Sequence, residues 1–373
     1  MRIGVNARLL LSEKMEGMPR FTYETTRQMA VDHPDDDFIL FFDRKIKVDF
    51  DFPSNVQKIV IPLQTRHPAL WYIWFELLIP IYLKRYCIDV FFSADGYLSL
   101  NAAVPTVMVI HDLAYLHFPS HISFATLKYY QHFVPKYLDR SATIITVSEF
   151  VKNDIITRFR IDINKVKVAY NAVSKPKPTT LESMPSDIQN EVADHPYFLY
   201  VGALHPRKNI VGLIRGFRHF NNLKNGQYRL VLAGRMAWKT DDIKKEMGQS
   251  NDVIYAGMVS ESTKYNLLAK AEAMTYISLF EGFGIPILEA MSCGCPVITS
   301  SVTSMPEVAG DAALLADPAD PQSISKAMQQ IIDDVEFRSQ LIEKGYKRVN
   351  DFSWKNSADL IYSSLIEAIY QLK

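Results

Sequence analysis

Residues 274–300 read MTYISLFEGFGIPILEAMSCGCPVITS, and the pattern of this segment indicates the fold. Apolar and β-branched residues predict a short buried strand at 274–277 and another at 297–300. Between them, two glycines indicate a turn, and the following proline suits the first position of a helix over 286–292. A strand, a helix and a second strand in this order predict one βαβ unit of a parallel sheet.

The same alternation extends through the rest of the chain. Predicted strands lie at 2–7, 38–42, 58–61, 90–93, 106–110, 143–147, 166–169, 197–201, 229–233 and 253–255, and predicted helices at 19–31, 70–85, 124–139, 149–159, 210–220 and 263–271. Two further helical runs follow residue 300. The pattern predicts an α/β protein with a parallel sheet in each half.

A stretch rich in Pro, Ser and Thr at 174–196 interrupts this alternation and indicates a linker between domains, with one short helix near 188–192. We therefore expect two Rossmann-like, doubly wound domains at 1–173 and 197–353, facing each other across a cleft that holds the ligand. The last segment, 354–373, has apolar residues at helical spacing and is predicted to be a separate amphipathic helix.

The composition narrows the range of functions that the chain can have. The 373 residues carry 41 Lys+Arg against 41 Asp+Glu, and this balance argues against bulk binding of nucleic acid. Three cysteines are too few for a disulfide framework, so a reducing, cytoplasmic setting is expected.

No targeting segment is visible. The most apolar run, 68–83, predicts a buried amphipathic helix. The alternative is a helix over 70–85 that contacts a membrane surface through Trp71, Tyr72, Trp74 and Phe75.

The turn of the opening stretch carries the first candidate site. Glu281 precedes its glycines, and Glu289 lies one turn inside the helix that follows. Glycines let a phosphate approach the backbone, and the N–H groups at a helix start attract anions. The two carboxylates could accept hydrogen bonds from sugar hydroxyls on either side of such a phosphate. The alternative is a plain strand–loop–helix joint, in which the acidic side chains stabilise the helix by interacting with its dipole.

A second strand–turn–helix joint carries Arg207 and Lys208 where the helix begins. Cations at a helix start oppose the helix dipole, so helix stability does not explain them. A guanidinium and an ammonium group beside helix N–H groups form an effective phosphate clamp. The alternative is ordinary surface charge.

Several shorter motifs complete the pattern: Glu16-Gly17-Met18, His111-Asp112-Leu113, Val147-Ser148-Glu149-Phe150, Pro206-Arg207-Lys208-Asn209 and Ser304-Met305-Pro306-Glu307-Val308. Together with the Glu281…Glu289 stretch, they make the chain resemble the retaining glycosyltransferases of the GT-B fold. The family is glycosyltransferase family 4, the large group 1 family of bacterial mannosyl- and glucosyltransferases of surface polysaccharides such as lipopolysaccharide. The resemblance covers nearly the whole chain. It implies that the domain at 1–173 binds the acceptor, that the domain at 197–353 binds the nucleotide sugar, and that the helix at 354–373 packs back on the first domain.

The resemblance implies roles for residues of the second half. Glu289 resembles the acid that binds the nucleotide ribose, and Glu281 the acid near the transferred sugar. Lys208 resembles the lysine that neutralises the diphosphate. The backbone of Phe283, Gly284 and Ile285 resembles the segment that holds sugar and phosphate. Many relatives carry an arginine directly after the strand glycine, where this chain has Ala203, so Arg207 is expected to share the clamp. Arg235 is a weaker candidate.

In the first half, His111 resembles the histidine beside the donor sugar. A packed structural histidine is the alternative. Gly17 and Met18 match the loop close to the diphosphate, although relatives usually have a second glycine in place of Met18.

The expected activity is transfer of a hexose with retention of configuration, without a metal ion or a resident cofactor. The expected donor is a nucleotide-diphosphate sugar, first GDP-mannose and then UDP-hexoses, and the acceptor is a glycan or a lipid-linked sugar. Peripheral contact with the inner membrane face is an expected partner interaction. Two rivals stay open: a sugar-nucleotide epimerase on the same fold, and a non-catalytic sugar-nucleotide-binding protein.

Overall fold

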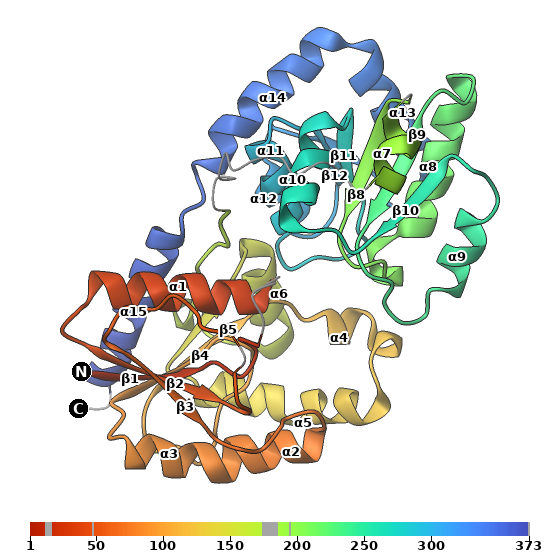
Figure 1. Cartoon of the computed structure of the whole chain (residues 1–373). Coiled ribbons are helices and arrows are strands. Elements are labelled where there is room, and N and C mark those ends of the chain that lie inside the picture. Colours follow the sequence, from red (N-terminus) through yellow and green to blue (C-terminus); the bar gives the residue numbers. More distant parts are fainter. Residues whose placement is uncertain (12–16, 47, 174–185, 194, 372–373) are drawn as a thin grey trace. The chain divides into compact units, whose positions relative to one another are not determined.

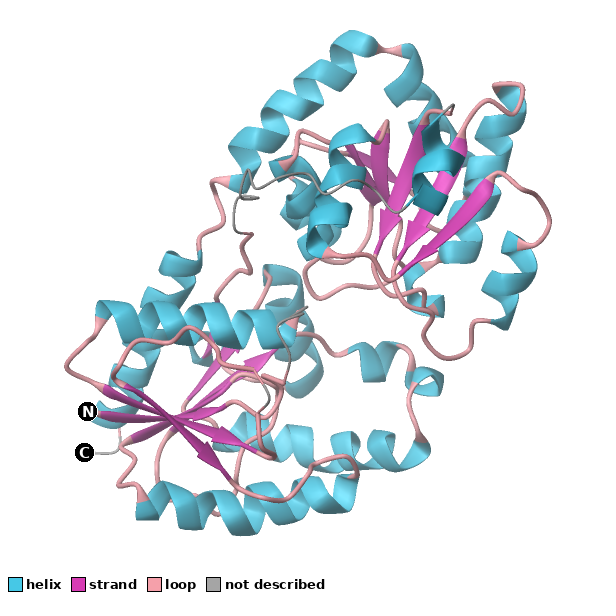
Figure 2. Cartoon of the chain, viewed as in Figure 1, coloured by secondary structure: helices cyan, strands magenta, loops and turns pink. Residues whose placement is uncertain are grey.

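The computed structural model describes residues 1–11, 17–46, 48–173, 186–193 and 195–371 (Figure 1). Glu16 and most of the predicted linker lie outside these residues. The chain divides into two compact units: unit 1 comprises Met1–Asn171 with Ser353–Lys373, and unit 2 comprises Ala172–Phe352. Each unit is an α/β structure whose strands form one sheet with helices around it (Figure 2).

The sheet of unit 1 has seven parallel strands among the described residues, in the order β3-β2-β1-β4-β5-β6-β7. Their bounds are β1 (Arg2–Asn6), β2 (Asp37–Phe42), β3 (Val56–Val60), β4 (Val90–Ser93), β5 (Thr106–Ile110), β6 (Thr143–Thr146) and β7 (Val166–Val168). On β1, Ile3 pairs with Phe38 on one side and Val90 on the other. The strand order therefore reverses between β1 and β4, which makes a topological switch point.

Helices cover both faces of this sheet. The helices of unit 1 are α1 (Met18–Asp32), α2 (Pro68–Tyr72), the π-helix η1 (Ile73–Leu78), α3 (Ile79–Arg85), α4 (Ala114–His117), η2 (Pro119–His121), α5 (Phe124–Arg140), α6 (Glu149–Phe159), η3 (Ile163–Lys165) and α15 (Trp354–Tyr370). The C-terminal helix α15 packs on α1, where Phe21 meets Trp354 edge to face, with ring centroids 6.0 Å apart. The run α2–η1–α3 and helix α5 lie on the opposite face (Figure 1).

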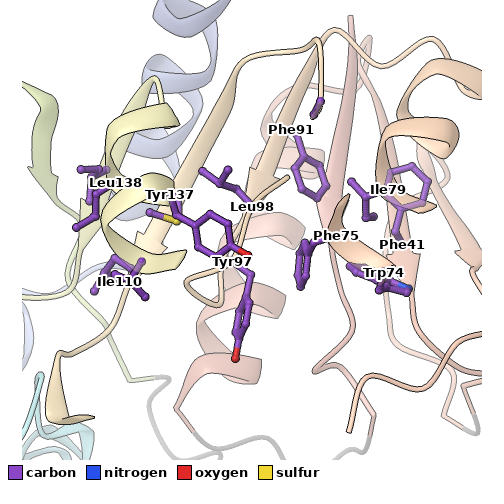
Figure 3. Close-up of a cluster of buried hydrophobic side chains, with 14 of the residues drawn as sticks. Phe41, Trp74, Phe75, Ile79, Phe91, Tyr97, Leu98, Ile110, Tyr137 and Leu138 are labelled. Atoms are coloured by element: carbon purple, nitrogen blue, oxygen red, sulfur yellow. The ribbon is translucent and has the colours of Figure 1, made fainter. Parts of the chain in front are cut away.

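Aromatic side chains fill the core on that opposite face (Figure 3). Trp74, Phe75 and Ile79 of the helical run are fully buried among strand residues such as Phe41 and Phe91.

The segment predicted as one helix at 70–85 is a continuous helical run from 68 to 85 with a π-helical turn in its middle. Pro80 is the cause of a local break in hydrogen bonding, because proline cannot donate to the carbonyl four residues earlier. That carbonyl, of Glu76, instead accepts a hydrogen bond from Asn101 Nδ2 at 3.2 Å. Trp74, Phe75 and Glu76 of the π-helical turn are all buried.

The sheet of unit 2 has six parallel strands among the described residues, in the order β10-β9-β8-β11-β12-β13. The strands are β8 (Tyr197–Val201), β9 (Arg229–Ala233), β10 (Val253–Gly257), β11 (Ala273–Tyr276), β12 (Val297–Ser300) and β13 (Leu314–Ala316). The helices are α7 (Ser186–Ala193), η4 (Pro206–Lys208), α8 (Ile210–Leu223), α9 (Asp241–Met247), α10 (Glu261–Lys270), α11 (Ile285–Ser292), α12 (Met305–Ala309), α13 (Pro321–Asp333) and α14 (Val335–Val349). The order reverses between β8 and β11, so unit 2 also has a switch point.

Among the helices that the structure describes, none combines the length and the apolar character needed to cross a bilayer.

Candidate functional site

The two predicted anion-binding joints meet at the switch point of unit 2. Strands β8 and β11 are parallel neighbours, with Phe198 opposite Ala273. Lys208 follows β8 and Glu281 follows β11, so both lie beyond the carboxyl ends of adjacent strands, where ligands of such sheets bind. The backbone joins the two loops directly, because Leu279 N–H donates to the carbonyl of Arg207 at 2.9 Å.

Lys208, Tyr276 and Glu281 form one hydrogen-bonded cluster, which we call the Lys–Tyr–Glu cluster. Lys208 Nζ donates to the Tyr276 hydroxyl at 2.8 Å and also to Glu281 Oε1. The Tyr276 hydroxyl in turn donates to Glu281 Oε1 at 3.0 Å. Burial raises the pKa of Tyr276 well above its ordinary value, so the hydroxyl stays protonated and remains a donor.

Glu281 is ionised in this cluster. Burial by itself would raise the pKa of this carboxyl, but the nearby charges of Lys208 and Arg207, with the hydrogen bond from Lys208, outweigh burial and hold the pKa below its usual range. Two cations and a carboxylate thus share the loop ends of β8 and β11.

The glycine turn before α11 depends on the backbone conformation of Gly284. Gly284 has a φ of 106°, which a side chain would strain, and a Cβ there would meet Ile287 Cδ1 at 3.1 Å. Ser304 Oγ fixes the turn by hydrogen bonding to the carbonyls of Glu281 and Phe283, each at 3.0 Å. The Phe283 side chain is buried against Phe352, so only its backbone can serve a ligand on this turn.

Glu289 lies in the second turn of α11 and is buried. Its Oε1 accepts a hydrogen bond from Lys264 Nζ of α10 at 2.7 Å. The ammonium of Lys264 also lies 4.7 Å from the ring centroid of Tyr265. This ion pair restricts the orientation of the Glu289 carboxylate, a group whose oxygens accept hydrogen bonds from hydroxyl groups.

The neighbouring loop after β9 approaches the loop after β8 closely. A Cβ at Gly234 would come within 1.9 Å of the Gly202 carbonyl oxygen, so this approach requires glycine. Arg235 follows at this edge and its side chain is exposed. Its carbonyl accepts a hydrogen bond from Leu204 N–H at 2.9 Å. Arg235 therefore lies at the correct end of the sheet, one strand away from the Lys–Tyr–Glu cluster.

The remaining predicted residues belong to unit 1. His111 follows β5, and its Nε2 contacts the Ala94 carbonyl at 2.8 Å. Because a carbonyl only accepts, Nε2 carries the proton and Nδ1 is left as an acceptor in the neutral ring. Burial lowers the pKa of His111 and favours that neutral form. The ring also packs edge to face on Phe21, with centroids 5.2 Å apart.

Gly17 and Met18 begin helix α1, the helix that also carries Phe21. Gly17 has a φ of 57° and open space around its Cα, and Met18 is 39% exposed. Unit 1 therefore brings Gly17, Met18 and His111 to the same end of its sheet.

Sequence reasoning missed three polar features. The sequence predicts Tyr276 only as part of a strand, although its position at the strand end beside the Glu281 loop is a usable signal. Lys264 stands on a helix before the site, and no spacing rule links it to Glu289. In unit 1, Arg8 and Asp95 form a buried ion pair with 2.5 Å between Nε and Oδ2, although 87 residues separate them in the sequence.

Among the residues that the structure describes, no group of three or more His, Cys, Asp or Glu side chains is arranged to hold a metal ion.

Comparison with known proteins agrees with this architecture. The family model described as "Glycosyl transferases group 1" matches residues 186–348, and the model "Glycosyltransferase Family 4" matches residues 16–175. The O-antigen chain mannosyltransferase B of Escherichia coli is 34% identical over 282 residues, which cover 74% of this chain and 73% of that protein.

Solved structures with low sequence identity share the fold. The sucrose-phosphate synthase of Thermosynechococcus elongatus superposes with a TM-score of 0.77 at 17% identity, covering 100% of both chains. HepE of Anabaena, solved in complex with UDP and glucose, superposes with a TM-score of 0.72 at 18% identity, covering 98% of this chain and 100% of that one. With two parallel α/β units of the GT-B fold and a relative of this similarity, the chain belongs to the group 1 glycosyltransferases of family 4.

Proposed function

We propose that this glycosyltransferase moves a mannosyl residue from GDP-mannose to a glycan or lipid-linked acceptor in surface polysaccharide synthesis, with retention of configuration. The observation that carries the proposal is the Lys–Tyr–Glu cluster at the switch point of unit 2, beside the glycine turn that opens α11. Cations, helix N–H groups and carboxylates at this edge of the sheet have the chemistry that would hold a sugar diphosphate.

Each part of the donor would contact the protein group that suits its chemistry. Glu289, oriented by Lys264, would accept hydrogen bonds from the ribose hydroxyls. Lys208 and Arg207 would face the diphosphate, with the backbone from Phe283 to Ile285 beside the phosphate and the sugar. Glu281 would accept hydrogen bonds from hydroxyls of the transferred sugar.

In the reaction, the bond from the anomeric carbon to the diphosphate oxygen breaks, and a bond to the acceptor oxygen forms on the same face. The departing phosphate oxygen takes the acceptor's proton, so the products are a nucleoside diphosphate and the glycosylated acceptor. Negative charge grows on the diphosphate as its bond breaks. Fixed cations such as Lys208 therefore stabilise the transition state more than the bound donor.

Unit 1 would supply the acceptor surface, and it also carries His111, Gly17 and Met18. A neutral His111 can accept a hydrogen bond from a sugar hydroxyl through Nδ1 without adding a charge near the anomeric centre. The choice of mannose over glucose is supported by the E. coli relative, which is named as an O-antigen mannosyltransferase. The HepE complex, which contains UDP, keeps UDP-hexoses as the second choice of donor.

The test begins with donor binding. Saturating nucleoside diphosphates raise the stability of a protein that binds them, by about 2.7 kcal/mol at a hundred times Kd, so GDP should raise the melting temperature more than UDP. Incubation with GDP-mannose and a mannan-type acceptor should then release GDP and give an α-linked product, and a chelator should leave the rate unchanged.

Other results would redirect the assignment. An epimerised sugar nucleotide formed without acceptor would identify an epimerase. Nucleotide binding with no turnover on any acceptor would identify a binding protein. An inverted product, or activity that EDTA abolishes and Mn²⁺ restores, would contradict the proposed mechanism.

A further inference from the structure

His111 is held by contacts from two other parts of unit 1. Its Nε2 donates to the carbonyl of Ala94, which follows β4, at 2.8 Å. One hydrogen bond fixes the direction of Nε2 but lets the ring turn about the line that joins the two atoms. The ring of Phe21 in α1 meets the imidazole edge to face, with an interplanar angle of 89° and centroids 5.2 Å apart. This second contact therefore fixes the plane of the imidazole.

Phe21 is itself fixed by its surroundings. Its side chain is fully buried, and its N–H donates to the Gly17 carbonyl at 3.0 Å in the first turn of α1. Phe21 thus lies one turn after Gly17 and Met18, the two residues of this helix start that belong to the candidate site. A closely packed ring without room to move can hold a neighbouring ring in one rotamer.

Trp354 is a second aromatic neighbour of Phe21. The two rings meet at an interplanar angle of 73° with centroids 6.0 Å apart. Trp354 is the first residue of α15, and the first turn of this helix is anchored because Ser357 Oγ donates to the Tyr170 carbonyl at 2.6 Å. The indole Nε1 is buried and has no hydrogen-bond partner among the residues that the structure describes. Trp354 therefore contributes the packing of its ring and not a hydrogen bond.

We propose that Phe21 and Trp354 are positioning residues for His111. The row Trp354–Phe21–His111 joins the start of α15, the start of α1 and the end of β5. It holds the imidazole in one plane, so that Nδ1, the acceptor of the neutral ring, keeps one direction. The inference rests on the proposed function, in which Nδ1 accepts a hydrogen bond from a sugar hydroxyl. A ring that turned freely would make that bond in only a fraction of the molecules, and the rate would fall accordingly.

The rival explanation is that these rings only attach α15 to α1. Aromatic side chains commonly stabilise such contacts between helices. An attachment alone predicts a loss of stability in the variants, without any effect on the ring of His111. The titration of His111 and the kinetics of transfer distinguish the two explanations.

The first test follows the histidine rings of the full-length, ¹⁵N-histidine-labelled protein by NMR, without donor or acceptor. The chain has nine histidines, and the spectrum of His111→Asn identifies the signal of His111. Burial lowers the pKa of His111, while the Ala94 carbonyl and the charges of Asp112 and Asp95 raise it. Phe21→Leu leaves these groups in place and opens the imidazole to water, so the pKa of His111 should rise toward its ordinary value of 6.5.

Three further variants make this test specific. Trp354→Leu should move the titration of His111 in the same direction by a smaller amount, and Trp354→Phe should restore the wild-type titration because it keeps a ring. The matched control is Phe41→Leu, which shortens an equally buried phenylalanine in the core on the opposite face of the sheet (Figure 3) and should leave His111 unchanged. Melting temperatures report the stability that each variant loses.

The second test is kinetic. Phe21→Leu should lower kcat about twofold to tenfold, the range that an edge-to-face ring pair contributes. The donor KM should change little, because unit 2 carries the proposed contacts to the nucleotide. In a double variant with His111→Asn, Phe21→Leu should have no further effect on kcat, since it acts only through His111. A purely structural contact would give the same loss in both backgrounds.

The inference is overturned if Phe21→Leu leaves the titration of His111 unchanged, or if Phe41→Leu moves it equally. It is also overturned if the titration changes but kcat does not, because His111 would then not serve the reaction. Failure of the proposed function gives a different result: without transfer from GDP-mannose there is no kcat to compare, while the NMR titration still decides whether the two rings position His111. If Phe21→Leu does not fold, the two Trp354 variants decide the question by the same measurements.

Discussion

The two units have polar clusters at equivalent positions of similar sheets, but the clusters are constructed differently. In unit 1, Arg8 follows β1 and Asp95 follows β4, and both side chains are almost completely buried. Asn6 Nδ2 donates to Asp95 Oδ1 at 2.7 Å, and the ring of Tyr97 lies 4.5 Å from the guanidinium carbon. In unit 2, the Lys–Tyr–Glu cluster lies beside loops and a turn made with glycine.

The difference separates a structural network from a binding site. Large rings cover the Arg8–Asp95 pair, so the protein itself supplies the surroundings of both charges. In unit 2, Gly202, Gly234 and Gly284 lie in the corresponding loops, and small residues leave backbone groups accessible to a ligand. Substitutions in the first cluster should therefore change stability, and substitutions in the second should change catalysis.

The largest effect is expected for Arg8→Ala. The change leaves Asp95 buried without its cation, which typically costs about 3–5 kcal/mol of unfolding free energy. Chemical denaturation of the full chain measures the loss. The matched control is Arg2→Ala, because Arg2 pairs with Asp37 at 3.4 Å on the exposed surface, where an ion pair contributes about 0–1 kcal/mol. Equal stability of the two variants would show that the buried pair is not a structural element.

Lys208→Ala should lower the rate of the reaction. By comparison with other fixed groups that stabilise developing charge, its loss should lower kcat by about 10²–10³-fold, or about 2.7–4 kcal/mol. Steady-state rates at varied donor concentration measure this effect, with Lys244→Ala as a surface control. A variant that changed only the KM for the donor would make Lys208 an anchor and remove the leaving-group role. Glu281→Gln should resemble Lys208→Ala in its kinetics.

Glu289→Ala should have a smaller effect, and mainly on donor binding. Ribose hydroxyls are contacted alike in the ground state and the transition state, so the KM for the donor should rise more than kcat falls. Hydrogen bonds to a charged group contribute about 1.5–3 kcal/mol, which corresponds to about a tenfold to hundredfold change in KM. Lys264→Ala should raise KM less, because the carboxylate remains but is no longer held. A fall in kcat at constant KM would contradict this division.

Much of this architecture can be predicted from the sequence because strand and helix periods are local properties. Alternating β-rich and helical runs predict the parallel sheets, and the glycines and Pro286 predict the start of α11 to within one residue. The spacing of Glu281 and Glu289 predicts that one carboxylate precedes the glycine turn and the other lies one turn inside α11, as the structure has them.

Contacts between distant segments could not be predicted in this way. Arg8 and Asp95 meet only because β1 and β4 are neighbours, and Lys264 reaches Glu289 only because α10 packs on α11. The run at 68–83 is predicted correctly as a buried amphipathic helix, but the sequence does not show which of its aromatic side chains are exposed. Trp74 and Phe75 are fully buried, whereas Tyr72 is 44% exposed.

The strand of Tyr276 can be predicted from the sequence, but its hydrogen bonds cannot. The smallest of the expected effects is that of Tyr276→Phe. In Tyr276→Phe the ring keeps its stacking on Tyr200, with centroids 6.0 Å apart, so the fold should persist. Loss of the hydroxyl removes one donor to Glu281 and one acceptor for Lys208. At about 0.5–1.5 kcal/mol for a hydrogen bond, kcat should fall about threefold to tenfold.

The pH dependence distinguishes this positioning role from a general loss of stability. The pKa of Glu281 lies below its ordinary value of 4.5, so the stabilisation by this carboxylate is present above that value and is lost as pH falls through the lower, folded-state pKa. A hydroxyl that donates to the carboxylate favours the ionised form, so Tyr276→Phe should raise the pKa of Glu281 and move the acid limb of kcat/KM to higher pH. The control is Tyr200→Phe, because that hydroxyl donates to the Ala203 carbonyl at 3.0 Å and not to the cluster. If both variants gave the wild-type acid limb, Tyr276 would only fill space beneath the glycine turn, and the orientation of Glu281 would depend on Lys208 alone.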